Sequence, residues 1–179
     1  MDLFKKCHDY ETVRLAKASG AYPYFIPLDE NEGTEVVYEG RRIIMCGSNN
    51  YLGLTTHPKV REAAIAAIKR YGTSCTGSRF LNGNMSLIEK LEGELAEWVG
   101  KDASLVFSTG MQVNLGTIHA LIGKDDIIIL DKEDHASIVD GAFLSGGKIE
   151  RFRHNDMVHL ERVLKSLPSD KGKLLVVDG

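Results

Sequence analysis

The sequence contains few cysteines, and their arrangement excludes two common kinds of structural framework. Only three occur among the 179 residues, and they are widely spaced. Scattered cysteines form neither a disulfide framework nor a CxxC metal-binding pair, so the sequence predicts no metal site. We expect Cys7, Cys46 and Cys75 to be free thiols in the reducing environment of a cytoplasmic protein.

A large excess of charge and long apolar runs are also lacking. The formal net charge at pH 7 is −3, which gives no general attraction to nucleic acid or to acidic membrane surfaces. The apolar runs are far too short to cross a bilayer, and the N-terminal stretch lacks the apolar core of a signal peptide. We therefore expect no nucleic-acid partner and no transmembrane segment.

Two glycine-rich nucleotide-binding motifs are missing as well. Neither GxGxxG nor GxxxxGK[ST] occurs, so the usual dinucleotide and P-loop interpretations lack support. The composition, with 43% hydrophobic and 26% charged residues, is typical of a soluble globular protein. The length is sufficient for one domain with a sizeable core.

Residues 1–45 are predicted to form an N-terminal helix, a connector and a hairpin. Apolar side chains recur at helical spacing over residues 3–19, and Gly20 is a typical helix end. Two prolines in the following stretch exclude helix there. Two β-rich runs on either side of Glu39-Gly40 then favour a hairpin.

Residues 46–179 are predicted to form the first part of a larger α/β domain. A helix is expected from Pro58, and Ser86-x-x-Glu89 is a capping box before a second helix that ends at Gly100. Strand-like and helix-like runs then alternate. Strands are expected at 103–107, 126–130, 148–152 and 174–177, and helices from Met111, Ala136 and Asp156. This alternation predicts a parallel-rich sheet with crossover helices, and a chain that stops just after a strand suggests a truncated domain.

The stretch FSTGMQVN, residues 107–114, is a candidate anion site at the end of the first of these strands. Ser108 or Thr109 can cap the helix that follows, and Gly110 lets a ligand approach the backbone closely. The free N–H groups of a first helical turn, together with the helix dipole, attract phosphate. The alternative is a capped helix without a ligand.

His135 follows the next strand, at the same edge of the predicted sheet. A histidine at this place can stack on an aromatic ligand or transfer a proton near neutral pH. The alternative is a helix-capping or surface histidine. The other histidines fall on helices or at loop ends without partners and are expected to be structural: His8, His57, His119, His154 and His159.

Two further polar stretches are ambiguous when taken singly. In GTSCTGSR, Arg79 could form a bidentate pair with a carboxylate or phosphate, or it could tie its loop to a neighbouring acid. In GSNNYLGL, Asn49 and Asn50 offer amide donors beside a turn, and the simple alternative is an Asx turn.

In combination and in this order, these stretches are far more specific. A resemblance to the α-oxoamine synthases is carried by NNYLGLTTHPKV, GTSCTGSRFLNGN, LEGELAEWVGKDASLVFSTGMQVN and DHASIVDG. These enzymes use pyridoxal 5′-phosphate (PLP) and have the transferase fold of type I, which is aspartate-aminotransferase-like. The resemblance covers essentially the whole chain. Within the family, GSRFLNGN and DKEDHASIVDG look most like bacterial serine palmitoyltransferases.

The resemblance implies roles for individual residues. Gly110 and Met111 match a pair at a helix start whose backbone helps to hold the cofactor phosphate. His135 matches a histidine that stacks on the pyridine ring and contacts the amino-acid substrate, so it is the expected catalytic residue. Asn49 matches a position that lines the substrate pocket at the subunit boundary of a homodimer.

The resemblance also implies an activity, namely the decarboxylative condensation of L-serine with a long-chain acyl-CoA to 3-oxosphinganine, the first step of sphingolipid synthesis. Other α-oxoamine synthases are the alternative: 2-amino-3-ketobutyrate CoA ligase, 8-amino-7-oxononanoate synthase or 5-aminolevulinate synthase, with glycine or alanine as possible substrates. A non-catalytic partner subunit is a further alternative, although such subunits tend to lose the histidine found here at position 135. The family's Schiff-base lysine and pyridine-nitrogen aspartate fall after the equivalent of Gly179, so this chain alone is expected to be inactive.

Overall fold

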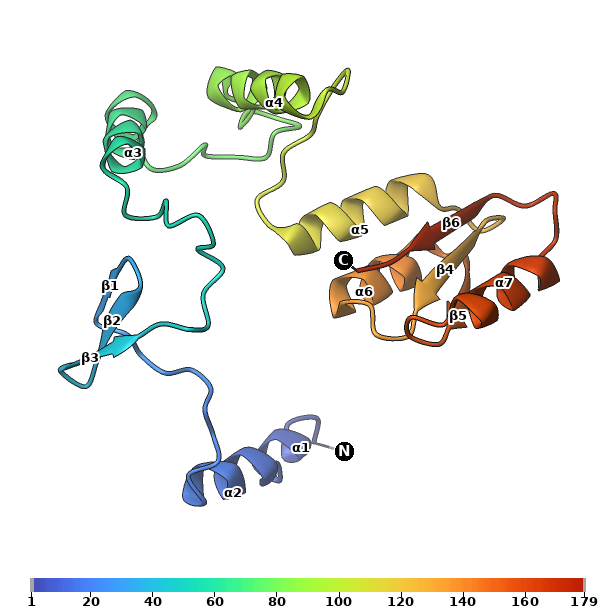
Figure 1. Cartoon of the computed structure of the whole chain (residues 1–179), viewed down its shortest axis with the longest axis horizontal. Coiled ribbons are helices and arrows are strands. Elements are labelled where there is room, and N and C mark those ends of the chain that lie inside the picture. The colour runs from blue at the N-terminus through green and yellow to red at the C-terminus, as the bar shows by residue number, and fades with distance from the viewer. Residues whose placement is uncertain (1, 179) are drawn as a thin grey trace. The chain divides into compact units, whose positions relative to one another are not determined.

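The computed structural model describes residues 2–178, without the side chains of residues 31 and 32, and it divides into two units (Figure 1). The first unit, residues 1–83, contains α1 (Lys5–His8), α2 (Thr12–Ala18), β1 (Glu30–Glu32), β2 (Glu35–Tyr38), β3 (Arg41–Ile44) and α3 (Pro58–Tyr71). The second unit, residues 84–179, contains α4 (Ser86–Val99), α5 (Gly110–Leu121), β4 (Ile127–Asp131), α6 (Ala136–Ser145), β5 (Lys148–Phe152), α7 (Met157–Ser166) and β6 (Lys173–Val176). A domain boundary after residue 45 stays a prediction.

The predicted hairpin in the first unit is confirmed. Strands β2 and β3 pair antiparallel, with Tyr38 opposite Arg41. The two residues between them, Glu39 and Gly40, have φ angles of 48° and 72°. Positive φ at both central positions matches the type I′ turn, whose twist suits a two-residue hairpin. Strand β1, which the sequence did not predict, pairs antiparallel with the other edge of β2.

The single helix predicted over residues 3–19 is wrong, because the segment forms two short helices. The guanidinium of Arg14 donates a hydrogen bond to the backbone carbonyl of His8 at 3.1 Å, so a side chain satisfies an acceptor at the end of α1. Neither helix has a buried residue. Since most helical stability in proteins comes from packing an apolar face, nothing favours one continuous helix over two short ones.

The second unit is built around a parallel sheet with the strand order β5-β4-β6. Every residue of the central strand β4 is buried. Because side chains alternate across a strand, Ile128 and Leu130 pack with α5 and α6, whereas Ile127 and Ile129 pack on the opposite face with residues of α7 (Figure 1). The prediction of a parallel sheet covered by crossover helices is confirmed.

Residues 103–107, predicted as a strand, form no strand ladder in the described structure. The N–H of Val106 donates to the carboxylate of Glu92 at 2.8 Å, and the hydroxyl of Ser104 donates to the backbone carbonyl of Glu92 at 2.7 Å. The segment therefore finds hydrogen-bond partners on α4 rather than on a neighbouring strand.

The capping box predicted at Ser86 and Glu89 is also wrong. Ser86 is the first residue of α4, and Met85 takes the N-cap position without a side-chain hydrogen bond. The carboxylate of Glu89 instead accepts a hydrogen bond from the side-chain amide of Asn84 at 2.7 Å. The predicted end of this helix is confirmed, because Gly100 has a φ of 65°, the left-handed conformation that favours glycine at a helix end.

Candidate active site

His135 lies just beyond the carboxyl end of the buried strand β4 and is the N-cap of α6. Its Nδ1 accepts a hydrogen bond from the backbone N–H of Ser137 at 3.1 Å. The structure thus confirms that His135 caps a helix, which was one of the two interpretations of the sequence. The side chain is nevertheless exposed, so capping leaves part of the imidazole free for a ligand.

A chain of hydrogen bonds connects His135 to α5. The hydroxyl of Ser137 lies 2.7 Å from Nδ1 of His135, and the side-chain amide of Asn114 donates to the same hydroxyl at 2.9 Å. Ser137 is only 3% exposed. Asn114 and Ser137 were missed by the sequence analysis, because nothing in the sequence shows that they meet.

The first turn of α5 has the features of an anion-binding helix start. The hydroxyl oxygen of Thr109, the N-cap, accepts a hydrogen bond from the N–H of Gln112 at 3.2 Å. Within the described structure, the N–H groups of Gly110 and Met111 have no hydrogen-bond partner. Such groups, together with the positive end of the helix dipole, attract phosphate.

Helices α5 and α6 run parallel, so their N-termini lie at the same end. Asn114 is linked to Ser137 near the start of both helices, and Nδ1 of His119 lies 3.1 Å from the carbonyl of Leu144 near their ends. Close approach is possible because a Cβ on Gly141 would lie 3.2 Å from the carbonyl oxygen of Asn114. Two positive helix ends and His135 therefore converge beyond the carboxyl end of β4, where α/β proteins commonly bind ligands.

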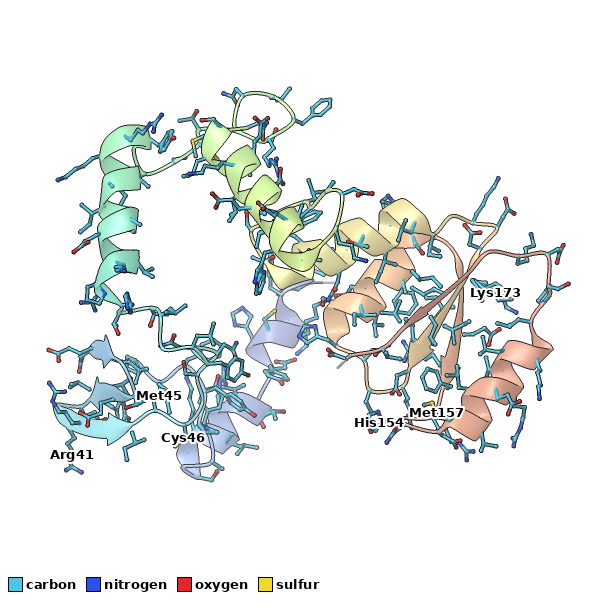
Figure 2. The ribbon with its side chains drawn as sticks, turned by 45° about the horizontal axis from the view of Figure 1, so that its top comes forward. Arg41, Met45, Cys46, His154, Met157 and Lys173 are labelled. Atoms are coloured by element: carbon cyan, nitrogen blue, oxygen red, sulfur yellow. The ribbon has the colours of Figure 1, made fainter. Side chains whose placement is uncertain are left out.

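Two buried carboxylates support the loops at this edge of the sheet. Asp131, which is 8% exposed, accepts hydrogen bonds from the N–H groups of Glu133 and Asn155 and from Nδ1 of His154. The bond from Glu133 is the main cause that lowers the pKa of Asp131, although burial opposes it. His154 lies in the loop between β5 and α7, near Met157 (Figure 2).

Asp134 is equally buried and joins β4 to the chain after β6. It accepts hydrogen bonds from the N–H groups of Asp131 and Asp178, each at 2.9 Å. Burial, which disfavours the charged form, is the main cause that raises the pKa of Asp134. The hydrogen bonds to Asp131 and Asp134 join the chain after β4 to the loop after β5 and to the chain after β6, which supports the loops at this edge.

The sequence analysis expected five histidines to lack partners, but three of them have hydrogen-bond contacts in the structure. His154 donates to Asp131, which raises the pKa of the imidazole. His119 contacts the carbonyl of Leu144, and His159 accepts the N–H of Arg153 at 3.0 Å. All of these contacts join loops and helices, which agrees with a structural role.

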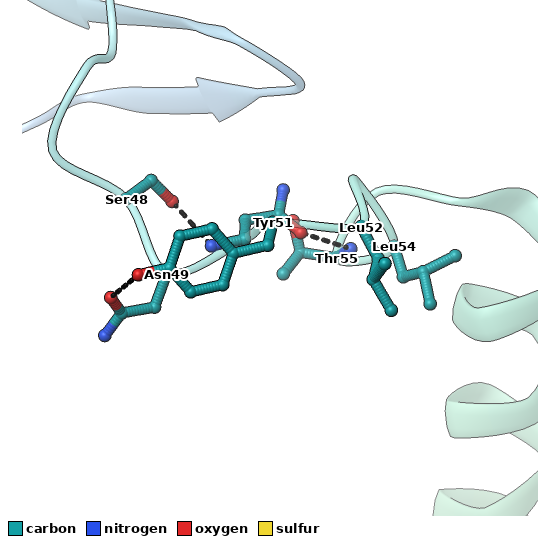
Figure 3. Close-up of a pocket in the computed structure, with 7 residues that line it drawn as sticks. Ser48, Asn49, Tyr51, Leu52, Leu54 and Thr55 are labelled. Atoms are coloured by element: carbon teal, nitrogen blue, oxygen red, sulfur yellow. Dashed lines mark hydrogen bonds between the residues drawn. The ribbon is translucent and has the colours of Figure 1, made fainter. Parts of the chain in front are cut away.

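Asn49 belongs to the first unit and lies in an exposed turn (Figure 3). Its side-chain oxygen is 3.5 Å from the hydroxyl of Tyr51, and the neighbouring Asn50 accepts the N–H of Thr55 at 3.4 Å. The turn borders an open hollow of about 530 Å³. The turn is not the Asx turn suggested by the sequence, because the N–H of Asn50 donates to the hydroxyl of Ser48 at 3.0 Å and the serine takes the capping role. A contact between Asn49 and substrate stays a prediction.

The GSR loop, residues 77–83, folds tightly on itself in the first unit. The carbonyl of Ser78 accepts hydrogen bonds from the N–H groups of Leu81, Asn82 and Gly83. A Cβ on Gly83 would lie 1.9 Å from the carbonyl oxygen of Gly77, so only glycine fits there. The role of Arg79 stays open between an anion contact and a loop tie.

The described residues contain no cluster of histidine, cysteine, aspartate or glutamate that could hold a metal ion, and the three cysteines are exposed free thiols. None of the helices described is long and apolar enough to cross a membrane.

Comparison with known proteins identifies the family. Residues 41–179 match the model of the aminotransferase class I and II family, and the chain belongs to this family. Its fold is accordingly the PLP-dependent, aminotransferase-like fold that the resemblance implied.

Curated relatives include several serine palmitoyltransferases. The enzyme of Sphingobacterium spiritivorum is 48% identical over 177 residues, which cover 99% of this chain and 44% of the relative. That of Bacteriovorax stolpii is 47% identical over 93% of this chain and 40% of the relative. The 8-amino-7-oxononanoate synthase of Geotalea daltonii is 40% identical over 94% of this chain and 43% of the relative. The chain thus spans less than half the length of these relatives.

Solved structures agree with this relationship. A serine palmitoyltransferase from Sphingomonas wittichii has a TM-score of 0.91 at 41% identity and covers 98% of this chain, which corresponds to 45% of that structure. A serine palmitoyltransferase from S. paucimobilis, with a bound PLP–myriocin aldimine, has a TM-score of 0.92 at 36% identity and covers 98% of this chain, or 46% of that structure.

Proposed function

We propose that the protein is a PLP-dependent acyltransferase that condenses L-serine with a long-chain acyl-CoA. The reaction joins the serine α-carbon to the acyl carbonyl carbon, releases CO2 and CoA, and forms 3-oxosphinganine. The observation that carries this proposal is the convergence of two helix N-termini and His135 at one edge of the sheet, in a chain that is 48% identical to a serine palmitoyltransferase.

The residues at this edge fit two parts of PLP. The unpartnered N–H groups of Gly110 and Met111 suit its phosphate, because they add hydrogen bonds to the positive end of the α5 dipole. The exposed imidazole of His135 suits its flat pyridine ring. Ala136, the small residue after the histidine, leaves space beside the ring.

PLP supplies an electron sink for the carbanion formed at the amino-acid α-carbon. The chain's own contribution is to hold the phosphate end and to place an imidazole against the reacting carbon. None of its lysines matches the Schiff-base position of the α-oxoamine synthases. We therefore propose that residues 1–179 alone do not turn over substrate.

We also infer that the functional unit is a homodimer in the cytoplasm, with Asn49 lining the substrate pocket at the subunit boundary. The exposed turn that carries Asn49 is available for such a contact. Light scattering coupled to size-exclusion chromatography tests the dimer. A monomer at micromolar concentration that retains full activity would contradict it.

A second α-oxoamine synthase activity is the main alternative, since the synthase of Geotalea daltonii is 40% identical to this chain. A competition assay between amino-acid substrates distinguishes the two activities. The full-length protein with PLP is offered L-serine, glycine and L-alanine together with acyl-CoA of long or short chain, and the products are identified by mass spectrometry. The proposal predicts 3-oxosphinganine as the main product. A product built from alanine or glycine would favour the alternative, and the absence of any PLP-dependent product would favour a non-catalytic subunit.

A further inference from the structure

We propose that Ser137 and Asn114 are positioning residues that fix the tautomer and the orientation of His135. The inference rests on the proposed function, because it gives His135 its contact with the reacting groups. Neither residue is assigned a contact with substrate. Both act through the imidazole, by way of the hydrogen bonds that join Asn114, Ser137 and Nδ1 of His135.

Two groups of Ser137 lie against Nδ1 of His135, and one of them is a donor that cannot reverse its direction. The backbone N–H of Ser137 points to Nδ1 of His135 at 3.1 Å, and a backbone N–H only donates. This N–H favours Nδ1 as the acceptor and the proton on Nε2 in the neutral ring. At 3.1 Å it is the longer of two contacts to the single lone pair of Nδ1, so it holds the tautomer only together with the Ser137 hydroxyl at 2.7 Å. The His135 tautomer thus has its N–H on the nitrogen that faces away from the helix cap.

The Ser137 hydroxyl strengthens this choice, because Asn114 determines which way it points. The amide of Asn114 donates to the hydroxyl oxygen at 2.9 Å, so the hydroxyl proton is free to turn to Nδ1 at 2.7 Å. Ser137 is buried and Asn114 is half-buried. Bulk water therefore competes little with the internal bonds, and the chain has one favoured direction, from Asn114 through Ser137 to His135.

The same series of hydrogen bonds connects the imidazole to the phosphate end of the site. Asn114 lies one helical turn after Gly110, and the close approach at Gly141 brings Asn114 within reach of Ser137. The rigid helix α5 thus fixes both the phosphate-binding N–H groups and the support of His135. The result is an Nε2–H that is held ready to donate to an oxygen of the amino acid or of the acyl group.

The experiment measures the tautomer directly, by nitrogen NMR of the full-length, PLP-loaded protein labelled with ¹⁵N-histidine. The His135→Asn variant identifies the His135 signals by their loss. His119 is an internal reference for the opposite tautomer, because its Nδ1 lies against a carbonyl and must donate. Steady-state kcat, and KM for L-serine, are measured on the same samples.

Two variants disturb this series of hydrogen bonds at different points. Ser137→Ala removes the hydroxyl, and Asn114→Asp replaces the amide donor by a carboxylate that draws the hydroxyl proton away from Nδ1. Ser137→Thr keeps the hydroxyl and serves as the conservative rescue. Ser166→Ala is the matched control, since its hydroxyl bonds only to a carbonyl within α7.

We expect the wild-type protein to show His135 with the proton on Nε2. In Ser137→Ala and Asn114→Asp only the backbone N–H of residue 137 still favours the proton on Nε2, so the fraction of the Nδ1–H form should rise above that of the wild type. We expect kcat to fall about tenfold, the size expected for one hydrogen bond used in the transition state. KM for L-serine should change less than about threefold. Ser137→Thr should retain the wild-type tautomer, and Ser166→Ala should retain both tautomer and kcat.

An unchanged tautomer in both Ser137→Ala and Asn114→Asp would overturn the proposal, even if activity fell. A wild-type His135 with the proton on Nδ1 would overturn it as well. If Ser137→Ala fails to fold, the His135 tautomer in Asn114→Asp, a change at a half-buried position, decides whether the proposal holds. The tautomer is read without substrate, so failure of the condensation assay with the expected NMR result would refute the proposed function and leave the positioning role intact.

Discussion

The carboxylate of Asp131 accepts a hydrogen bond from Nδ1 of His154 at 3.0 Å, which joins the carboxyl end of β4 to the loop after β5. The second carboxylate oxygen accepts the N–H of Asn155 at 3.1 Å. One buried side chain therefore holds the loop at the edge of the sheet where His135 lies. The stabilising effect of the hydrogen bond between Asp131 and His154 depends on the charges of these two side chains.

This pair gives the stability of the second unit a defined pH dependence. The hydrogen bond to Asp131 raises the pKa of His154, so its contribution is fully present below the unfolded histidine pKa of about 6.5 and is lost as pH rises through the folded value. The pKa of Asp131 is lowered, so its contribution is present above the unfolded value of about 3.9 and is lost as pH falls through the folded value.

His154→Asn should therefore destabilise the protein more at about pH 5.5 than at about pH 8.5. Urea unfolding of wild type and variant at both values checks this. His57→Asn serves as the control, because His57 lies in the other unit. An equal loss at both pH values would show that His154 stabilises the loop only as a neutral hydrogen-bond donor.

Gly141→Ala tests the close approach of α5 and α6. The new Cβ would lie 3.2 Å from both the carbonyl oxygen of Asn114 and the side chain of Ile118. We expect a loss of about 1–2 kcal/mol in unfolding free energy, since overpacking outweighs the better helix propensity of alanine. Gly93→Ala, in open space on α4, should instead stabilise by about 0.5–1 kcal/mol. Similar effects at the two positions would contradict the close helix contact.

His135→Asn separates helix capping from catalysis. Asparagine is a good N-cap, so the unfolding free energy should stay within about 0.5 kcal/mol of wild type. The ring and its Nε2–H are lost, and we expect kcat/KM for L-serine to fall by about 100-fold or more. Thermal unfolding and a CoA-release assay measure the two effects. If the variant retains activity, His135 acts as a helix cap and has no catalytic role.

Met111→Pro tests the backbone contact with phosphate. Proline is tolerated in the first turn of a helix, where the N–H that it lacks has no intrahelical partner. We expect the dissociation constant for PLP to rise about tenfold, while Met111→Ala, which keeps the N–H, changes it by less than about threefold. Titration followed by cofactor absorbance measures both. Equal affinities of the two variants would show that the phosphate does not use this N–H group.

Local patterns predicted those parts of the fold that depend on neighbouring residues. The run Ile127–Leu130 is apolar at every position, as expected for a central parallel strand covered on both faces. Glu39-Gly40 suits a turn with two positive φ angles. His135 was found because the residue after a parallel strand lies at the edge where ligands bind.

The remaining features depend on contacts between segments distant in sequence. Residues 103–107 have strand-like composition, but Ser104 and Val106 form hydrogen bonds to Glu92 on a helix. Asn114 and Ser137 are 23 residues apart and meet only because two parallel helices approach at Gly141. A single sequence carries no local signal of such a meeting, so the support of His135 became visible only in the structure.

The central claim is the decarboxylative condensation of L-serine, and isotope labelling tests it most directly. The full-length protein is incubated with PLP, palmitoyl-CoA and L-serine labelled with ¹³C either at the carboxyl carbon or at the β-carbon. The account predicts 3-oxosphinganine that retains the β-carbon label and loses the carboxyl label as CO2. A condensation product that keeps the carboxyl label, or no serine-derived lipid at all, would contradict it.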